Sequence, residues 1–156
     1  MFIYLGAGCF WGVEAEFRKL VGVLSTSVGY MGGTLENPSY EDVCTDLTGH
    51  AEVVQVEYDP LKVTYKDLLA MFFTLHDPTQ LNRQGPDIGS QYRSVIFYEN
   101  SNEKNISKNY IEEVSSKFKK PIVTSLEEKS TYYIAEEYHQ KYLEKRGLAS
   151  CHSGLA

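Results

Sequence analysis

The chain lacks the features of several protein classes. Basic residues are outnumbered, with 15 Lys and Arg against 21 Asp and Glu for a formal charge of −6, which argues against a nucleic-acid-binding surface. No apolar run approaches the length of a membrane span, and residues 1–6 have neither the basic start nor the apolar stretch of a signal peptide. We therefore expect a soluble cytoplasmic protein with no membrane or nucleic-acid partner.

Cysteine is scarce, and repeats and linkers are missing. The 156 residues contain three cysteines, an odd number that does not make a disulfide framework, so the reactivity of these thiols is the better question. Hydrophobic residues make up 42% of the chain, enough for one core but not for two ordinary domains. We expect a single domain over residues 1–156 that acts as a monomer and ends in a mobile tail over 146–156.

The hydrophobic pattern predicts strands and helices in succession. Short apolar or alternating runs predict strands, and apolar residues spaced by three or four predict helices. Their order (strand, helix, strand, strand, helix, strand, helix, strand, helix) is typical of an α+β or α/β two-layer sandwich. The expected strands are 2–7, 21–30, 53–58, 94–98 and 122–126, and the expected helices begin at Cys9, Thr64 and near Ile106, with a last helix from Ala135 to Lys145.

Two segments have no such periodicity. One is a loop containing Asn37, Pro38 and Ser39, and the other runs from Asp77 to Gln91. The second is long for a structureless connection in a compact domain, and loops of this length are often functional.

Cys9 lies where a buried strand changes to a helix. The unpaired N–H groups and the positive dipole end of a first helical turn favour an anion, and an ordinary thiol with a pKa of ~8.5 is only about 3% thiolate at pH 7. Cys9 is therefore a candidate nucleophile, the alternative being a buried structural cysteine. Gly6-Ala7-Gly8 also suggests a dinucleotide-binding turn, but Trp11 stands where the third glycine belongs and residues 25–30 offer no acid for a ribose.

Two aromatic residues follow the thiol directly. Phe10 and Trp11, the only tryptophan, come next along the expected helix. An aromatic wall beside a thiol suits a small apolar group, such as a methyl, attached to the atom under attack.

The segment Gly8-Cys9-Phe10-Trp11-Gly12 resembles the signature of the A-type peptide methionine sulfoxide reductase family. The resemblance extends in family order through residues 29–33, 37–40, 48–52, 76–79, 83–94 and 135–140. It implies an α+β sandwich with a ferredoxin-like core and a mixed sheet. It also implies a single catalytic domain that uses thiols, without a cofactor or metal, to reduce the S epimer of methionine sulfoxide, free or in peptides.

Site residues follow from the resemblance position by position. Cys9 is the thiolate that attacks the sulfoxide sulfur, and Glu52 is the acid that protonates the departing oxygen, which requires burial that raises its pKa. Tyr40 and Tyr92 match the tyrosines whose hydroxyls hydrogen-bond the sulfoxide oxygen. Asp87 matches a pocket carboxylate that orders this network.

The same resemblance implies how the enzyme binds its substrate and is recycled. Phe10 and Trp11 hold the substrate methyl group. Loss of oxygen leaves Cys9 as a sulfenic acid, and Cys151 in the expected tail matches the resolving cysteine that condenses with it. Thioredoxin then reduces the Cys9–Cys151 disulfide. The third cysteine, Cys44, is interpreted as a small buried structural residue.

Each assigned residue also has an ordinary interpretation. Glu52 could be an exposed strand residue, and Tyr40 is one of 12 tyrosines. Asp87 could be a turn residue between a proline and a glycine.

Two other classes of function fit parts of the pattern. A Cys-His hydrolase would pair Cys9 with His50 or His139 and would have no use for Cys151. A non-enzymatic methionine-binding module would keep all of its function in a Cys9→Ser variant. The histidines lack the close spacing of a metal-ligand motif, and His139 is interpreted as a hydrogen-bonded structural residue.

Overall fold

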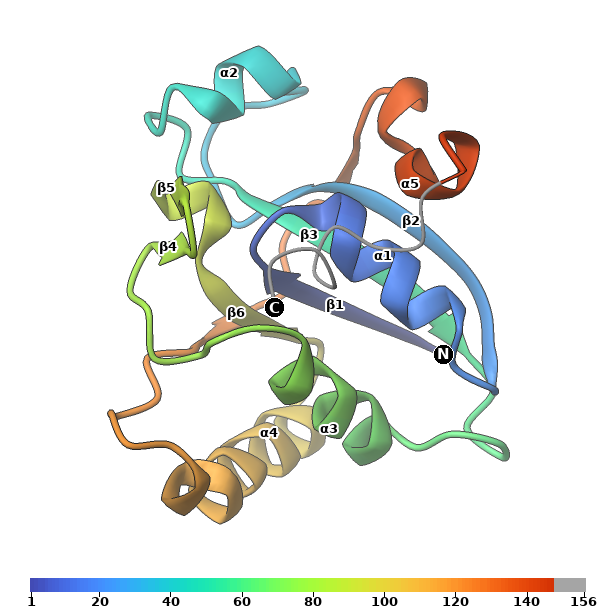
Figure 1. Cartoon of the computed structure of the whole chain (residues 1–156), viewed down its shortest axis with the longest axis vertical. Helices are drawn as coiled ribbons and strands as arrows, with labels where there is room; N and C mark the ends of the chain where they lie inside the picture. Colours follow the sequence, from blue (N-terminus) through green and yellow to red (C-terminus); the bar gives the residue numbers. More distant parts are fainter. Residues whose placement is uncertain (148–156) are drawn as a thin grey trace.

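The structure is a computed structural model that describes residues 1–147, and it is built on a six-stranded sheet (Figure 1). In sequence order the strands are β1 (Phe2–Ala7), β2 (Val23–Met31), β3 (Ala51–Tyr58), β6 (Ser94–Tyr98), β7 (Ser125–Glu128) and β8 (Tyr133–Ile134). Their spatial order is β7-β6-β1-β3-β2-β8, with β6 and β7 parallel and the other neighbours antiparallel. Two short strands form a separate hairpin, β4 (Arg83–Gln84) and β5 (Asp87–Ile88).

Helices cover one face of this sheet. In Figure 1, α1 and α3 lie in front of the central strands, with α4 beside α3. The inner order β6-β1-β3-β2, with α1 after β1 and α3 after β3, is the expected ferredoxin-like arrangement. The helices are α1 (Phe10–Arg18), α2 (Tyr40–Cys44), α3 (Tyr65–Leu75), α4 (Ser101–Val114) and α5 (Tyr142–Lys145), with 3-10 turns η1 (Ser90–Tyr92), η2 (Ser115–Lys117) and η3 (Glu137–His139).

The main core lies between the sheet and the helices. Successive side chains of a strand point to opposite faces, so β3 contributes Val54 and Val56 to this core and Ala51 and Val53 to a smaller cluster behind the sheet. Tyr132 packs against that second cluster. The same alternation points Glu52 to the helix-covered face, together with Val54.

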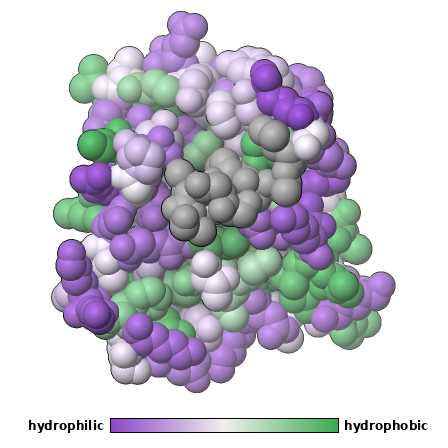
Figure 2. Space-filling model, in the orientation of Figure 1, coloured by the Kyte–Doolittle hydropathy of each residue, from purple (hydrophilic) through white to green (hydrophobic). Residues whose placement is uncertain are grey.

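Hydrophilic residues dominate the face of the molecule shown in Figure 2, and hydrophobic residues form separate patches on it. Exposed leucines such as Leu47 and Leu61 lie on connections between elements. No helix within residues 1–147 is long and apolar enough to cross a membrane.

Most of the predicted elements are confirmed. The strands over 2–7 and 94–98 have the predicted bounds. At the predicted helix start, the Thr64 hydroxyl accepts the Asp67 N–H at 3.1 Å, and the Asp67 carboxylate accepts the Thr64 N–H at 2.9 Å. The strand expected from residue 122 begins only at 125, because the Val123 N–H donates to the Pro78 carbonyl at 2.8 Å instead of joining the sheet.

The predicted last helix over 135–145 is wrong. The segment follows β8 and is divided into η3 and α5, and Lys141 between them has a left-handed φ of 52°. The Gln140 side chain hydrogen-bonds both the N–H and the carbonyl of Val28, at 2.9 and 2.8 Å, and Glu14 accepts the Lys141 N–H at 2.7 Å. These contacts with other elements hold the segment in a non-helical path.

Candidate active site

The turn after β1 places Cys9 at the start of α1. Gly8 has a φ of 94°, and a Cβ at this position would lie 2.9 Å from the Gln84 side chain, so the turn and the close approach both require glycine. Cys9 is the N-cap residue of α1 and is half-buried. Cys9 thus stands at the positive dipole end of α1, and the predicted thiol at a helix start is confirmed.

Glu52 lies against this helix start. The side chain is 1% exposed, and its Oε1 accepts the N–H of Phe10, the residue after the thiol, at 3.2 Å. Oε2 is buried and has no hydrogen-bond partner among residues 1–147. Burial raises the pKa of Glu52 to about 8, the Asp87 carboxylate adds to the rise, and the Phe10 N–H opposes it. The carboxyl is therefore largely protonated at pH 7, as the role implied by the resemblance requires.

Two tyrosines and an aspartate complete the polar part of the site. Tyr40 is the first residue of α2, Tyr92 is the last of η1, and Asp87 lies in β5. Burial is the main cause that raises the pKa of both tyrosines, and the charge of Glu52 raises it further. Asp87 raises the pKa of Glu52 and of Tyr92. The structure thus brings these four side chains into one electrostatically coupled group in which the hydroxyls remain donors.

The aromatic side of the site is layered. Phe10 is 1% exposed, with its ring centroid 5.2 Å from that of His139. Trp11 is half-buried, stacks on Tyr142 with centroids 3.7 Å apart, and donates its indole N–H to His139 Nδ1 at 2.9 Å. Trp11 therefore joins the helix start to the segment that follows β8.

Glu136 connects that same segment to the tyrosine side. Its Oε2 accepts the backbone N–H of Tyr40, and its Oε1 accepts the hydroxyl of Tyr30, both at 2.9 Å. Burial opposes ionisation, but these hydrogen bonds outweigh it and lower the pKa of Glu136. An ionised carboxylate therefore fixes the first residue of α2 from across 96 residues of sequence.

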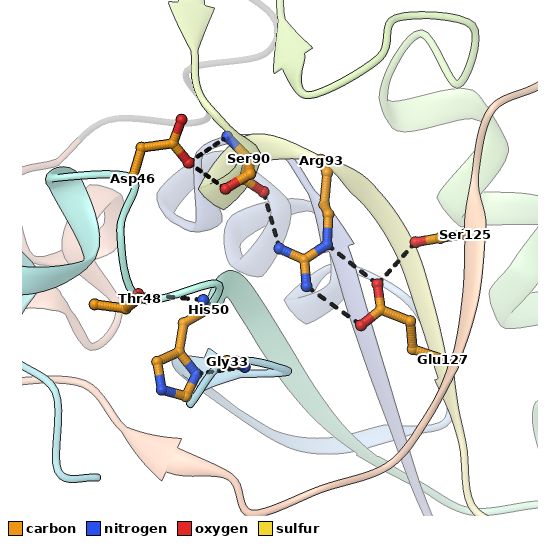
Figure 3. Close-up of polar contacts among 8 residues, drawn as sticks. All are labelled: Gly33, Asp46, Thr48, His50, Ser90, Arg93, Ser125 and Glu127. Carbon is orange, nitrogen blue, oxygen red and sulfur yellow. Dashed lines mark hydrogen bonds and ion pairs between the residues drawn. The ribbon is translucent and has the colours of Figure 1, made fainter. Parts of the chain in front are cut away.

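A second network of hydrogen bonds and an ion pair includes Asp46, Ser90, Arg93 and Glu127 (Figure 3). One carboxylate oxygen of Asp46 accepts both the N–H and the hydroxyl of Ser90. Arg93 donates to the Ser90 carbonyl at 3.0 Å and pairs with Glu127, at 3.2 Å from Nε. The loop before β3 and the 3-10 turn η1 are therefore joined to each other and to the sheet edge at β7.

Comparison with known proteins decides the family. Residues 1–156 match the family model described as peptide methionine sulfoxide reductase. The chain belongs to this family. It is 58% identical over 149 residues to peptide methionine sulfoxide reductase MsrA of Acidobacterium capsulatum, covering 94% of this chain and 96% of the relative.

Solved structures of this reductase family share the fold. Reduced Mxr1 of Saccharomyces cerevisiae superposes with a TM-score of 0.88 at 40% identity, covering 94% of this chain and 86% of that one. Mxr1 in complex with Trx2 gives a TM-score of 0.63 at 30% identity, covering 91% and 84%. The expected α+β fold with a mixed sheet is confirmed.

The structure also bears on the other candidate residues of this reductase family member. Both ring nitrogens of His50 contact backbone: Nδ1 accepts the Gly33 N–H at 3.0 Å, and Nε2 lies 2.7 Å from the Leu35 carbonyl oxygen. His139 Nδ1 accepts from Trp11. These contacts do not favour a Cys-His hydrolase. Within residues 1–147, no group of three His, Cys, Asp or Glu side chains could hold a metal ion.

The interpretation of Cys44 as a buried residue is wrong, and the assignment of Cys151 falls outside the part of the chain that the structure describes. Cys44 ends α2 and is exposed, because this one-turn helix buries only Val43. Cys151 and the expected tail beyond Gly147 lie outside the described residues.

Sequence reasoning missed three residues that support the site. Glu136, Glu14 and Asp46 each bond to backbone or side chains far away in sequence. Their only local signal was that Glu136 lies in a segment resembling the family pattern.

Proposed function

We propose that this chain reduces the S epimer of methionine sulfoxide, free and in peptides, to methionine with the roles set out below. The observation that carries the proposal is the Glu52 carboxyl. It is neutral at pH 7, one oxygen is buried without a partner among residues 1–147, and the other accepts an N–H from the residue next to Cys9. A proton donor is thus held beside a thiol on a helix start.

The chemical step needs both groups. The Cys9 thiolate attacks the sulfoxide sulfur and forms an S–S bond with it, while Glu52 supplies a proton to the oxygen. The hydroxyl group then moves from the substrate sulfur to the Cys9 sulfur, which breaks the S–O and S–S bonds of the adduct, and methionine leaves. The oxygen ends on Cys9 as a sulfenic acid, so the thiol is oxidised and the sulfoxide reduced. The hydroxyls of Tyr40 and Tyr92 stabilise the developing negative charge on oxygen, and Asp87 keeps that network ordered.

The aromatic residues supply substrate binding. Phe10 and Trp11 form an apolar surface next to the thiol, which suits the methyl group on the sulfoxide sulfur. In this proposal the polar group binds the sulfoxide oxygen and the aromatic surface binds the methyl group, so the site contacts these two substituents of the sulfur differently. This arrangement supports selectivity for one epimer.

Recycling of the thiol is proposed from the resemblance and from a relative. The Cys151 thiol condenses with the Cys9 sulfenic acid, releasing water and forming a disulfide. The structure of Mxr1 in complex with Trx2 supports thioredoxin as the dithiol that reduces this bond. We place the enzyme in the cytoplasm, as a monomeric catalytic domain over 1–156, because thioredoxin keeps thiols reduced in the cytoplasm.

The test is a single turnover without reductant. The full chain is mixed with excess S-epimer N-acetylmethionine sulfoxide, the N-acetylmethionine product is quantified, and disulfides are mapped by mass spectrometry. We expect about one product per enzyme and a Cys9–Cys151 bond, with no product from Cys9→Ser. Absence of product from the unaltered chain, with its thiols still free, would reject the reductase proposal in favour of a binding module.

A further inference from the structure

A surface groove borders the candidate site on the side of the β4–β5 hairpin. It has a volume of about 850 Å³ and is lined by the end of α3, the connection from α3 to β4, one residue of α1 and residues 117–120 after α4. The connection and the chain after α4 lie side by side (Figure 1), and the Val123 N–H donates to the Pro78 carbonyl at 2.8 Å between them. The groove thus contains residues 77–86, the part of the long predicted loop that the proposed chemistry does not use.

Gln84 forms a wall that the groove shares with the site. Its side chain lines the groove and lies so close to Gly8, the residue before Cys9, that a Cβ at Gly8 would be 2.9 Å from it. In the β4–β5 hairpin Gln84 pairs with Asp87 of the candidate site. Its amide accepts the N–H of Asp77 and donates to the carbonyl of Asp77, both at 2.9 Å, which holds the wall in place. A polypeptide with one side chain at Cys9 therefore has the groove as a neighbouring surface.

Three lysines give the groove a positive charge in a chain whose formal charge is −6. Lys117, Lys119 and Lys120 line it, are exposed, and form no ion pair with any other group of residues 1–147. The half-buried ring of Phe118 adds an apolar contact among them. Exposed ammonium groups without ion pairs are available to the carboxylates of another molecule.

The carboxylates that line the groove do not cancel this charge. Glu16 forms an ion pair at 3.2 Å with Lys19, which lies outside the groove. The Asp77 carboxylate accepts the N–H and the hydroxyl of Thr79, at 3.0 and 2.5 Å. The groove therefore presents three lysines against two carboxylates that already have partners.

We propose that this groove is an exosite, a second binding surface for the substrate, which binds acidic residues of an oxidised polypeptide while its methionine sulfoxide occupies the site at Cys9. The proposal rests on the proposed function and adds the class of polypeptide that the enzyme prefers. Carboxylates beside the sulfoxide are attracted by the lysines, whereas a basic segment is repelled. Free methionine sulfoxide has no flanking residues and gains nothing from the groove.

Steady-state kinetics with matched peptides test the exosite. Two peptides carry the S sulfoxide and three aspartates, placed before the sulfoxide in one and after it in the other, and each has a partner with asparagines instead. Dithiothreitol is the reductant, so a thioredoxin-binding surface cannot contribute. We expect at least one acidic peptide to have a KM about five-fold below that of its partner, and the difference to vanish in about 1 M salt, where the screening length is about 3 Å. Equal KM values within both pairs at low salt would overturn the proposal.

A triple variant and a matched control locate the effect. Replacing Lys117, Lys119 and Lys120 by glutamine should bring the KM ratio of the paired peptides from about five to near one, with KM for N-acetylmethionine sulfoxide unchanged. The control replaces three exposed lysines that do not line the groove, Lys62, Lys104 and Lys108. Both changes remove three positive charges, and the control should keep the ratio. Loss of the ratio in the control, or its persistence in the groove variant, would overturn the assignment.

A binding measurement separates failure of the exosite from failure of the proposed function. Cys9→Ser has no thiol at this position, so the fluorescence anisotropy of labelled sulfoxide peptides gives their Kd without turnover. We expect the acidic peptide to bind Cys9→Ser about five-fold more tightly than its partner, and equally once the three groove lysines are also replaced. Equal Kd values in Cys9→Ser alone would overturn the exosite even in an active enzyme. If the unaltered chain reduces no sulfoxide, the proposed function fails, and the anisotropy still decides whether the groove binds acidic chains.

Discussion

Glu52 is the residue at which burial and proton donation depend on each other. Its pKa of about 8 means that the proton is present at pH 7 and is lost in mild alkali. We expect the single-turnover rate of the wild type to fall as pH rises through about 8. Glu52→Gln cannot donate a proton and should be slower by about 10²- to 10⁴-fold at pH 7, with no inflection near pH 8. Rapid-quench measurement of methionine from pH 6 to 9.5 checks both statements.

The raised pKa of Glu52 also makes the stability of the fold depend on pH. A carboxyl whose pKa is raised by folding contributes stability that is fully present below its unfolded pKa, near 4.5, and that is lost as pH rises through about 8. Glu52→Gln has no such loss, so its stability relative to wild type should increase by on the order of 4 kcal/mol between pH 4.5 and 9. Urea unfolding at the two pH values measures this. Glu128→Gln, an exposed change in β7, should show no such pH dependence.

The two tyrosine hydroxyls should act on the transition state more than on binding. Tyr40→Phe and Tyr92→Phe each remove one donor to the oxygen, and we expect kcat to fall by about 10- to 10³-fold with little change in KM. The double variant should lose less than the product of the two effects, because both hydroxyls serve one oxygen. Tyr98→Phe, in β6, is the control that should keep wild-type rates. An unchanged kcat in both single variants would remove the tyrosines from the mechanism.

At the scale of elements, α3 is a helix whose start depends on one local device. Thr64 and Asp67 cap each other, and Thr64→Ala leaves the Asp67 N–H without its acceptor. We expect a loss of about 1 kcal/mol in the free energy of unfolding with kcat unchanged, since α3 supplies no site residue. Chemical denaturation measures the loss. Lys62→Ala, an exposed change just before the cap, should stay within about 0.5 kcal/mol of wild type.

The contrast between α3 and the segment over 135–145 shows what the sequence could reveal. The start of α3 is set by residues three positions apart, so its pattern can be read locally. The path of the last segment is set by Glu14 and by the backbone of Val28, more than 100 residues away. The short α2 was missed for a different reason: its capping pair, Ser39 and Asp42, lies in a loop without hydrophobic periodicity.

The candidate site likewise has features that the local sequence predicts and features that depend on distant contacts. Cys9 and its aromatic neighbours could be read from a strand that ends in glycines before a helix. The raised pKa of Glu52 was a requirement of the chemistry rather than a property of its neighbours in sequence, and the structure supplies the burial that produces it. The bond from Glu136 to the Tyr40 backbone could not be predicted, because no local sequence pattern places the segment after β8 beside α2.

At the scale of the whole molecule, turnover links the described domain to residues beyond it. Cys151→Ser should still make about one methionine per enzyme in the absence of reductant, because Cys9 and Glu52 are intact. It should fail to turn over with thioredoxin, because no disulfide with Cys9 forms. Product assays with and without thioredoxin separate the two steps. Normal thioredoxin-driven turnover in Cys151→Ser would require another resolving thiol.

The register of β2 against β3 has a consequence for the chemistry. Tyr30 pairs with Glu52 in a ladder that continues without a shift from Ser25 to Met31. A slip of one residue would turn Glu52 to the opposite face of the sheet, away from α1 and the thiol. The raised pKa of the proton donor thus depends on the register of backbone hydrogen bonds between β2 and β3. A single residue inserted in β3 would remove the burial that raises this pKa, although every side chain of the site would still be present in the chain.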